Sequence, residues 1–286
     1  MKLASVALVS AFAFATHTDS AFGKPEQRKV DVVALDYAFQ VPRELPPGAT
    51  TFGLENKGKK RHELNIFLLK PGATVTQVLE LQKAGKPTQA LVEGPVGVLF
   101  AKPGKTSPSR LSTDLRPGRE YGVICIFRDT AKAPRHFEMG MYSTIRVKAG
   151  PSVRSRVTAR ADTIVGFDYA FRYPQQLDPG RHSFLFRNEG KHRHEFSVTL
   201  LKSGVTLANV VEVDKVDGDI DPLIDTGMGL VWARAGETPL GRLEMNLLPG
   251  REYLIDCGFT DDDKSPPHYK LGMYGSIKVT GKPEVN

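Results

Sequence analysis

The amino-acid sequence predicts an all-β protein made of two tandem Greek-key β-sandwich domains, each with a short helical insertion. Three observations support this prediction. The chain contains one unit written twice. Each unit consists of short β-branched or aromatic runs separated by Gly, Pro and Asn. Each unit also contains a Pro-Gly-Arg-Glu-Tyr turn, which is typical of the entry into a sandwich strand that is capped by a tyrosine corner.

The internal repeat keeps one register over most of the chain. The motif Asp-Tyr-Ala-Phe begins at Asp36 and again at Asp168, and Pro-Gly-Arg-Glu-Tyr begins at Pro117 and again at Pro249. Both pairs lie 132 positions apart. For a chain of 286 residues this offset predicts two copies of one domain, at about residues 28–149 and 158–281, joined by a basic, turn-rich stretch.

Within a unit, the apolar residues follow the pattern of strands. Strands are predicted for five runs in the first copy: Val30–Leu35, Thr51–Leu54, Leu64–Leu68, Tyr121–Ile126 and Thr144–Val147. The segment Thr74–Lys83 instead places apolar residues at helical spacing, and Thr206–Val213 is its counterpart. These two segments are the predicted helical insertions.

The first 23 residues read as a secretory signal peptide. Lys2 supplies a positive start, residues 3–15 form an apolar run, and a small-residue cleavage pattern ends at Gly23. The protein is therefore expected in the periplasm or outside the cell. No later stretch reaches the ~20 apolar residues of a membrane helix, so no integral membrane segment is expected.

The formal net charge of +7 is dispersed over the chain, apart from short runs such as residues 57–61. Dispersed charge favours solubility, and its functional interpretation is an acidic redox partner protein or an anionic cell surface. Nucleic acid is not an expected partner, because the sequence lacks a basic platform studded with aromatic residues and the protein is expected to be exported.

The repeat also selects the residues that could carry chemistry, since a ligand set should recur in both copies. Four pairs of metal-ligating side chains recur 132 positions apart: His62 and His194, Cys125 and Cys257, His136 and His268, Met141 and Met273. His17, His182, His192 and Met139 have no such counterpart, and the three histidines are expected to face solvent.

With these residues the chain resembles the cupredoxins, the blue-copper family of plastocyanin and its relatives. The resemblance covers nearly all of both repeats. It rests on Tyr-x-x-x-Cys, then a loop, then His with Met five positions later and Gly before the Met, as in Tyr121, Cys125, His136, Gly140 and Met141 and again from Tyr253 to Met273. The resemblance implies one type 1 copper site in each domain, up to two copper ions per chain, and an electron-transfer carrier.

The ligand chemistry agrees with this resemblance. A soft thiolate, two imidazoles and a weak axial thioether form the donor set of electron-transfer copper. Zinc would prefer a fourth Cys, His or carboxylate over Met. Three of the four ligands come from one segment and the first histidine from a distant strand, so metal binding is expected to clamp the two sheets of each sandwich together.

Two features depart from the small blue proteins. Ten residues separate Cys125 from His136 and Cys257 from His268. The residue after the first histidine is Glu63 or Glu195, where plastocyanin-like proteins often have an Asn that hydrogen-bonds across to the ligand loop. Both departures are expected to change the control of the metal by its surroundings.

Four alternatives compete with an electron carrier. Two of them lack a metal: a copper-free cupredoxin-like binding module, and a Cys125–Cys257 disulfide, which is favoured by export but requires the two domain poles to meet. A third keeps the copper for storage or delivery. The fourth is a two-domain copper oxidase or nitrite reductase, which joins its blue site to a catalytic copper through a His beside the Cys. Neither cysteine has a neighbouring His, so the chain is not expected to be an enzyme.

Overall fold

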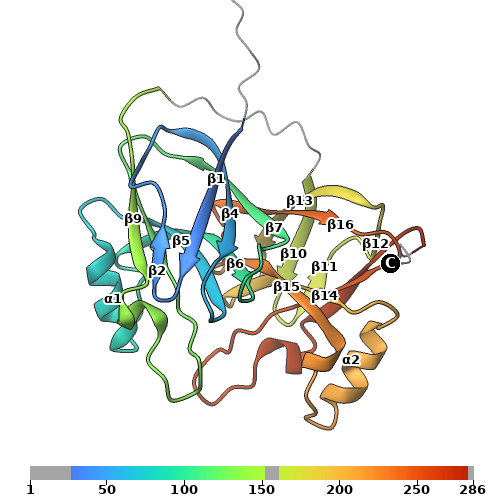
Figure 1. The fold of residues 1–286 in the computed structure, drawn as a ribbon. Coiled ribbons are helices and arrows are strands. Elements are labelled where there is room, and N and C mark those ends of the chain that lie inside the picture. Colours follow the sequence, from blue (N-terminus) through green and yellow to red (C-terminus); the bar gives the residue numbers. More distant parts are fainter. Residues whose placement is uncertain (1–26, 152–160, 283–286) are drawn as a thin grey trace, which may run out of the picture.

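The computed structural model describes residues 27–151 and 161–282. The predicted signal peptide lies outside the described residues, as do His17 and most of the stretch between the repeats. In Figure 1 the first repeat, coloured blue to green, occupies the left of the molecule, and the second, yellow to red, occupies the right. No helix in the described part of the chain has the length and apolar character needed to cross a membrane.

The first repeat is a sandwich of two layers. One layer contains β1 (Arg28–Leu35), β2 (Ala38–Gln40), β4 (Gly48–Asn56) and β7 (Ser109–Leu115). The other contains β3 (Glu44–Leu45), β5 (His62–Leu69), β6 (Val92–Ala101), β8 (Glu120–Ile124) and β9 (Tyr142–Val147). Strand β1 runs parallel to β4, and β3 runs parallel to β9, while the other neighbours are antiparallel. Helix α1 (Val75–Lys83) connects β5 to β6, and the short 3-10 helix η1 (His136–Met139) precedes β9.

The second repeat has the same order of elements, with one added 3-10 helix, η2, after its α-helix. Its layers are built from β10 (Ala161–Phe167), β11 (Ala170–Arg172), β12 (Gln176–Leu177), β13 (Gly180–Asn188), β14 (His194–Leu201), β15 (Ile224–Ala233), β16 (Gly241–Leu247), β17 (Glu252–Asp256) and β18 (Tyr274–Val279). Its helices are α2 (Leu207–Asp214), η2 (Asp221–Leu223) and η3 (His268–Leu271). The prediction of two Greek-key sandwiches with helical insertions is confirmed, whereas the boundaries 28–149 and 158–281 stay a prediction.

Local features explain the ends of these elements. Thr74 caps α1, because its hydroxyl accepts from the Gln77 N–H at 3.3 Å and the Gln77 side chain accepts from the Thr74 N–H at 2.9 Å. Both tyrosine corners are formed. The buried Tyr121 hydroxyl accepts from the Arg116 N–H at 3.1 Å, and the Tyr253 hydroxyl accepts from the backbone N–H five residues before it at 2.9 Å.

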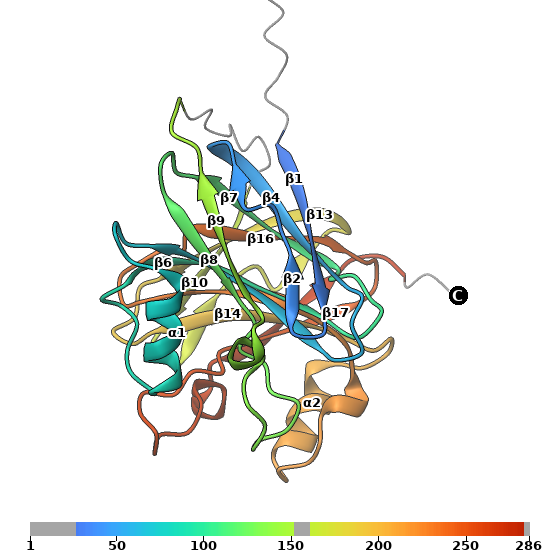
Figure 2. The same cartoon turned by 60° about the vertical axis from the view of Figure 1, so that its left-hand side comes forward.

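The two repeats share both sheets, which the sequence did not predict. Strand β7 pairs antiparallel with β16, and β6 pairs antiparallel with β15, so the layers are one sheet of eight strands and one of ten (Figures 1 and 2). Glycines allow the backbones to approach at this junction. A Cβ on Gly229 would lie 2.7 Å from the Val98 carbonyl oxygen, and one on Gly97 would lie 2.9 Å from the Leu230 carbonyl oxygen.

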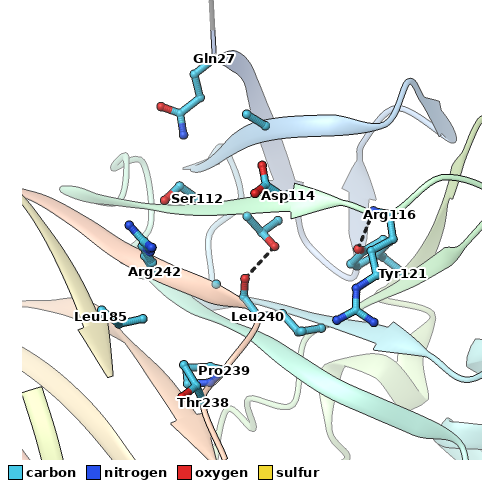
Figure 3. A pocket seen from close by; sticks show the side chains of 13 residues that line it. Gln27, Ser112, Asp114, Arg116, Tyr121, Leu185, Thr238, Pro239, Leu240 and Arg242 are labelled. Carbon is cyan, nitrogen blue, oxygen red and sulfur yellow. Dashed lines mark hydrogen bonds between the residues drawn. The ribbon is translucent and has the colours of Figure 1, made fainter. Parts of the chain in front are cut away.

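Figure 3 shows the junction at the eight-stranded sheet, where a cavity of about 310 Å³ opens beside β7 and β16. The Thr113 hydroxyl donates to the Leu240 carbonyl oxygen at 2.9 Å across this junction. The core beneath it is one cluster of buried side chains drawn from both repeats, and it includes Cys125 and Met141. No predicted metal ligand lines this cavity.

Candidate metal centres

The structure brings His62, Cys125 and His136 together at one end of the first repeat. His62 begins β5, Cys125 follows β8 directly, and His136 begins η1. The Nδ1 atoms of the two histidines lie 3.1 Å apart, and Cys125 Sγ lies 3.5 Å from His136 Nδ1. All three side chains are fully buried. Their donor atoms lie within 4.8 Å of one another.

The second repeat contains the same cluster, made of His194, Cys257 and His268. The two Nδ1 atoms lie 3.0 Å apart. Cys257 Sγ lies 3.4 Å from the Nδ1 of His268 and 3.9 Å from that of His194. The near identity of the two clusters shows that each is produced by its own repeat, and both are buried.

Met141 is tied to the cysteine and the second histidine by the backbone. The Cys125 N–H donates to the Met141 carbonyl oxygen at 3.1 Å, and the Met141 N–H donates to the His136 carbonyl oxygen at 3.0 Å. Gly140 makes the turn between them with a φ of 105°, in the left-handed region that favours glycine. Met273 has the same backbone bonds, and both methionine side chains are fully buried. Their role as ligands stays a prediction.

A carboxylate faces the outer nitrogen of each histidine. Asp36 Oδ1 lies 3.2 Å from His62 Nε2, and Asp129 Oδ1 lies 3.4 Å from His136 Nε2, the latter without hydrogen-bond alignment. In the second repeat Asp168 and Asp261 lie 3.1 Å and 3.0 Å from the corresponding nitrogens. An Nε2–H directed at a carboxylate leaves the Nδ1 lone pair free. The two Nδ1 atoms of each cluster therefore face one another on the side away from the carboxylates.

Two Nδ1 atoms at this distance can share one proton, and with the cysteine sulfur they can equally bind one metal ion, so the donor set fits a metal ion. Donors held about 2.0–2.3 Å from one ion lie about 3–4 Å from each other. The distances of 3.0–3.9 Å in the two clusters are in this range. Two imidazoles and a thiolate are the in-plane ligands of type 1 copper.

Burial sets the protonation of these groups. It lowers the pKa of His62 and His194, so both imidazoles are neutral and able to coordinate at neutral pH. It also raises the pKa of the Cys125 and Cys257 thiols to about 12. Without a cation both thiols hold their protons, and a bound metal ion would have to displace them.

The glutamates that depart from the plastocyanin pattern still contact the metal cluster. The Glu63 N–H donates to Cys125 Sγ at 3.3 Å, and the Glu195 N–H donates to Cys257 Sγ at 3.4 Å. The Glu195 side chain also accepts from the Gly258 N–H at 2.9 Å, so it bridges to the ligand loop. Burial raises the pKa of both glutamates to about 7.

The expectation that the metal clamps the two sheets together is wrong. His62, Cys125 and Met141 adjoin β5, β8 and β9, which are neighbours in the ten-stranded sheet. Contact with the other layer comes from Asp36, in the turn between β1 and β2, which reaches across to His62. The metal would therefore join strand ends of one sheet, and a carboxylate supplies the link between sheets.

Sequence reasoning missed the groups around the ligands. These are the four aspartates and two tyrosines, Tyr37 and Tyr169, whose rings meet His136 and His268 edge-on at 5.2 Å. Both tyrosines have the left-handed φ that is rare for bulky residues, 66° and 63°. The signal was present, because Asp36, Tyr37 and Asp129 all recur 132 positions later.

One expectation about the histidines is wrong. His182 does not face solvent: its side chain is 17% exposed, and its Nδ1 lies 2.7 Å from Asp162. His192 is 41% exposed, but its Nδ1 contacts Asp261 at 2.7 Å, beside the second cluster. Met139 is partly exposed at the surface. The disulfide alternative is also wrong, since Cys125 and Cys257 are both free.

Comparisons with known proteins find similarity in structure alone. No family model and no curated protein matches the chain. A reduced auracyanin from Roseiflexus castenholzii is 17% identical, with a TM-score of 0.28, over 42% of this chain and 95% of that one. A copper nitrite reductase and a blue copper oxidase, both from Nitrosomonas europaea, are each 14% identical. They cover 91% and 89% of this chain and 95% and 86% of their own, with TM-scores of 0.25 and 0.24.

These structures correct one expectation. The prediction that the chain is not an enzyme is contradicted, because multicopper oxidases and copper nitrite reductases are among the solved structures that it resembles. The remaining conclusion follows from the molecule itself. Its layer order, tyrosine corners and paired His-Cys-His clusters are those of a two-domain cupredoxin-like protein.

Proposed function

We propose that the chain is an exported copper protein that holds one type 1 copper ion in each repeat and transfers single electrons. The observation that supports this most strongly is the pair of buried clusters in which two Nδ1 atoms and one Sγ converge within 4.8 Å. Copper bound there would cycle between Cu(I) and Cu(II). The eight proposed ligands are His62, Cys125, His136, Met141, His194, Cys257, His268 and Met273.

Each group around the copper has a distinct part in this proposal. The histidines would bind through Nδ1, since their Nε2 atoms face Asp36, Asp129 and the equivalent aspartates. The cysteine thiolate would accept the N–H of Glu63 or Glu195, which lowers the negative charge available to the metal. The methionine would be a long axial ligand, which tunes the potential more than the affinity.

Full burial of the ligands favours a resident ion. His62, Cys125, Met141 and their counterparts are 0% exposed, so release of copper would require the ligand loops to open. Storage or delivery of copper needs easier exchange than this burial allows. An acidic redox partner fits the net charge of +7 and the basic run at residues 57–61, next to the first cluster.

Titration of the purified chain with Cu(II) tests the proposal. We expect two copper ions per chain and an intense visible band from the thiolate-to-Cu(II) bond. Cys125→Ser should remove half of the band, and Cys257→Ser the other half. Met139→Leu is the matched control, because the second repeat carries Leu271 at that position. If both serine variants keep the band, the clusters are not type 1 copper sites.

Voltammetry separates electron transfer from storage. A carrier should show reversible one-electron waves at both sites without loss of copper. Release of the ion on reduction would instead support storage or delivery.

A further inference from the structure

The space beneath the inserted helix differs between the two repeats. In the first repeat, α1 covers an apolar cluster that includes Ile124 and Phe137, which are 1% and 3% exposed. The positions 132 residues later are Asp256 and Tyr269. The buried cluster beneath α2 is correspondingly small, and a cavity of about 470 Å³ opens between α2, β17 and η3. In the first repeat, the space beneath the inserted helix is thus filled by apolar side chains.

The cavity lies apart from the metal cluster. Along β17, Tyr253 and Ile255 belong to the main core, and Cys257, just after the strand, is buried with His194 and His268. Leu254 belongs to the small cluster under α2, and Asp256 lines the same cavity. Side chains alternate between the faces of a strand, so Asp256 and Cys257 face opposite sides. No predicted metal ligand lines the cavity.

A carboxylate without a cationic partner distinguishes this cavity. Among residues 27–151 and 161–282, no ion pair involves Asp256, and its side-chain hydrogen bond is to Ser197. Of the two lysines that line the cavity, Lys270 is held by Asp214 at 2.8 Å and by Asp217 at 3.1 Å. Within the described residues, neither Lys270 nor Lys215, the second lysine of the cavity, forms an ion pair with Asp256, so its carboxylate is open to an ammonium group from outside.

The other lining groups suit an organic cation better than a bare metal ion. Leu207, Val210 and Leu254 provide apolar walls, and the rings of Tyr269 and Tyr274 lie at the same cavity. Aromatic faces attract ammonium groups, and one lysine ammonium already lies 5.8 Å from the centre of the Tyr269 ring. A volume of about 470 Å³ is typical of pockets for small molecules.

We propose that this cavity binds a small organic amine. Its ammonium group pairs with the Asp256 carboxylate, and its hydrocarbon part lies against Leu207, Val210 and Leu254. The proposal does not depend on copper, since the cavity and the metal cluster lie on opposite faces of β17. It assigns to the second repeat a binding site that the first repeat fills with Ile124 and Phe137.

Binding of benzylammonium and n-butylammonium to the full chain, with and without copper, tests this site. We expect chemical-shift changes in the NMR signals of Leu254, Tyr269 and Tyr274. Benzyl alcohol, which matches benzylammonium in shape without the charge, should bind at least tenfold more weakly. Asp256→Asn should weaken benzylammonium at least tenfold. Asp221→Asn removes the same charge from a nearby residue outside the cavity and should change nothing.

Several results would overturn the proposal. The proposal fails if neither amine binds at concentrations up to millimolar. It also fails if the amine and the alcohol bind equally well. Unchanged affinity in Asp256→Asn, or shifts confined to another face, also rejects the site. Asp256→Ile introduces the residue that the first repeat carries there, and it should lose the amine. If neither variant folds, the comparison of amine and alcohol on the unaltered chain decides the matter.

Discussion

Copper binding should release about one proton per site, because both cysteines are buried thiols. The pKa of Cys125 and Cys257 is raised to about 12 by burial, and type 1 copper binds the thiolate. The pKa of His62 and His194 lies below its usual value, so at pH 8 these imidazoles are already neutral and can coordinate without releasing a proton. The proton released at pH 8 should therefore come from the thiol.

The free energy needed to ionise the thiol follows from the difference between the pH and the thiol pKa. At pH 8 the thiol lies about four units below its pKa, and each unit corresponds to about 1.4 kcal/mol. Ionising it therefore costs about 5 kcal/mol, which the bond to copper must supply. The sign is fixed: raising the pH lowers this cost, so the apparent copper affinity should increase about tenfold per pH unit between pH 7 and 9.

Calorimetry at pH 8 in two buffers of different ionisation enthalpy measures the proton count. We expect about two protons per chain for the unaltered protein and about one for Cys125→Ser. Met139→Leu should match the unaltered protein. Full copper loading with no proton release would refute this reasoning, since it would mean that the thiolates exist before the metal arrives or that the cysteines are not ligands.

Three further predictions concern the first metal cluster. Met141→Leu should keep copper and shift the reduction potential, as measured by voltammetry, because the axial thioether bond is weak. Asp129→Asn should raise the potential and weaken copper binding about 10- to 100-fold, because the adjacent imidazole becomes a poorer donor; an unchanged potential would exclude this role. Gly58→Ala would place a methyl group against the Asp36 carboxylate and should reduce copper binding at this site alone in the titration, whereas Gly94→Ala, with no contact under 3.4 Å, should not.

Much of the fold could be predicted because the repeat gave two samples of each element. The tyrosine corners and the two helices follow local signals, and the structure places them within a residue or two of the predicted positions. Strand β8 ends at Ile124, earlier than the predicted Ile126, because the next backbone groups bond to η1: the Cys125 carbonyl oxygen accepts from the Phe137 N–H at 2.9 Å, and the Phe127 carbonyl oxygen accepts from the His136 N–H at 3.0 Å. From this point the chain continues as the loop that carries His136 and Met141.

The sharing of sheets could not be predicted in this way. A comparison of the two copies shows which features both contain. It cannot show a contact between the copies, such as the pairing of β6 with β15. Gly97 and Gly229 recur at the same offset, but a glycine alone does not name the strand that approaches it.

The two His-Cys-His clusters could also be predicted only in part. Cys and His are rare in the sequence, so their recurrence predicted both clusters. Asp36 and Asp129 are residues of a type that is common in surface turns, so their recurrence did not indicate a role at the site. Their place beside the histidines depends on how the turn between β1 and β2 and the loop after Cys125 fold back. That information lies in the tertiary structure.

The shared sheets also make the two halves mutually dependent. A single repeat expressed alone would leave the long edges of β6 and β7 without partners, and exposed edges of this kind template association with other chains. Within the chain, each repeat covers these edges of the other. The backbone ladders between the halves also oppose hinge motion at this junction, so the two His-Cys-His clusters are held in one rigid frame.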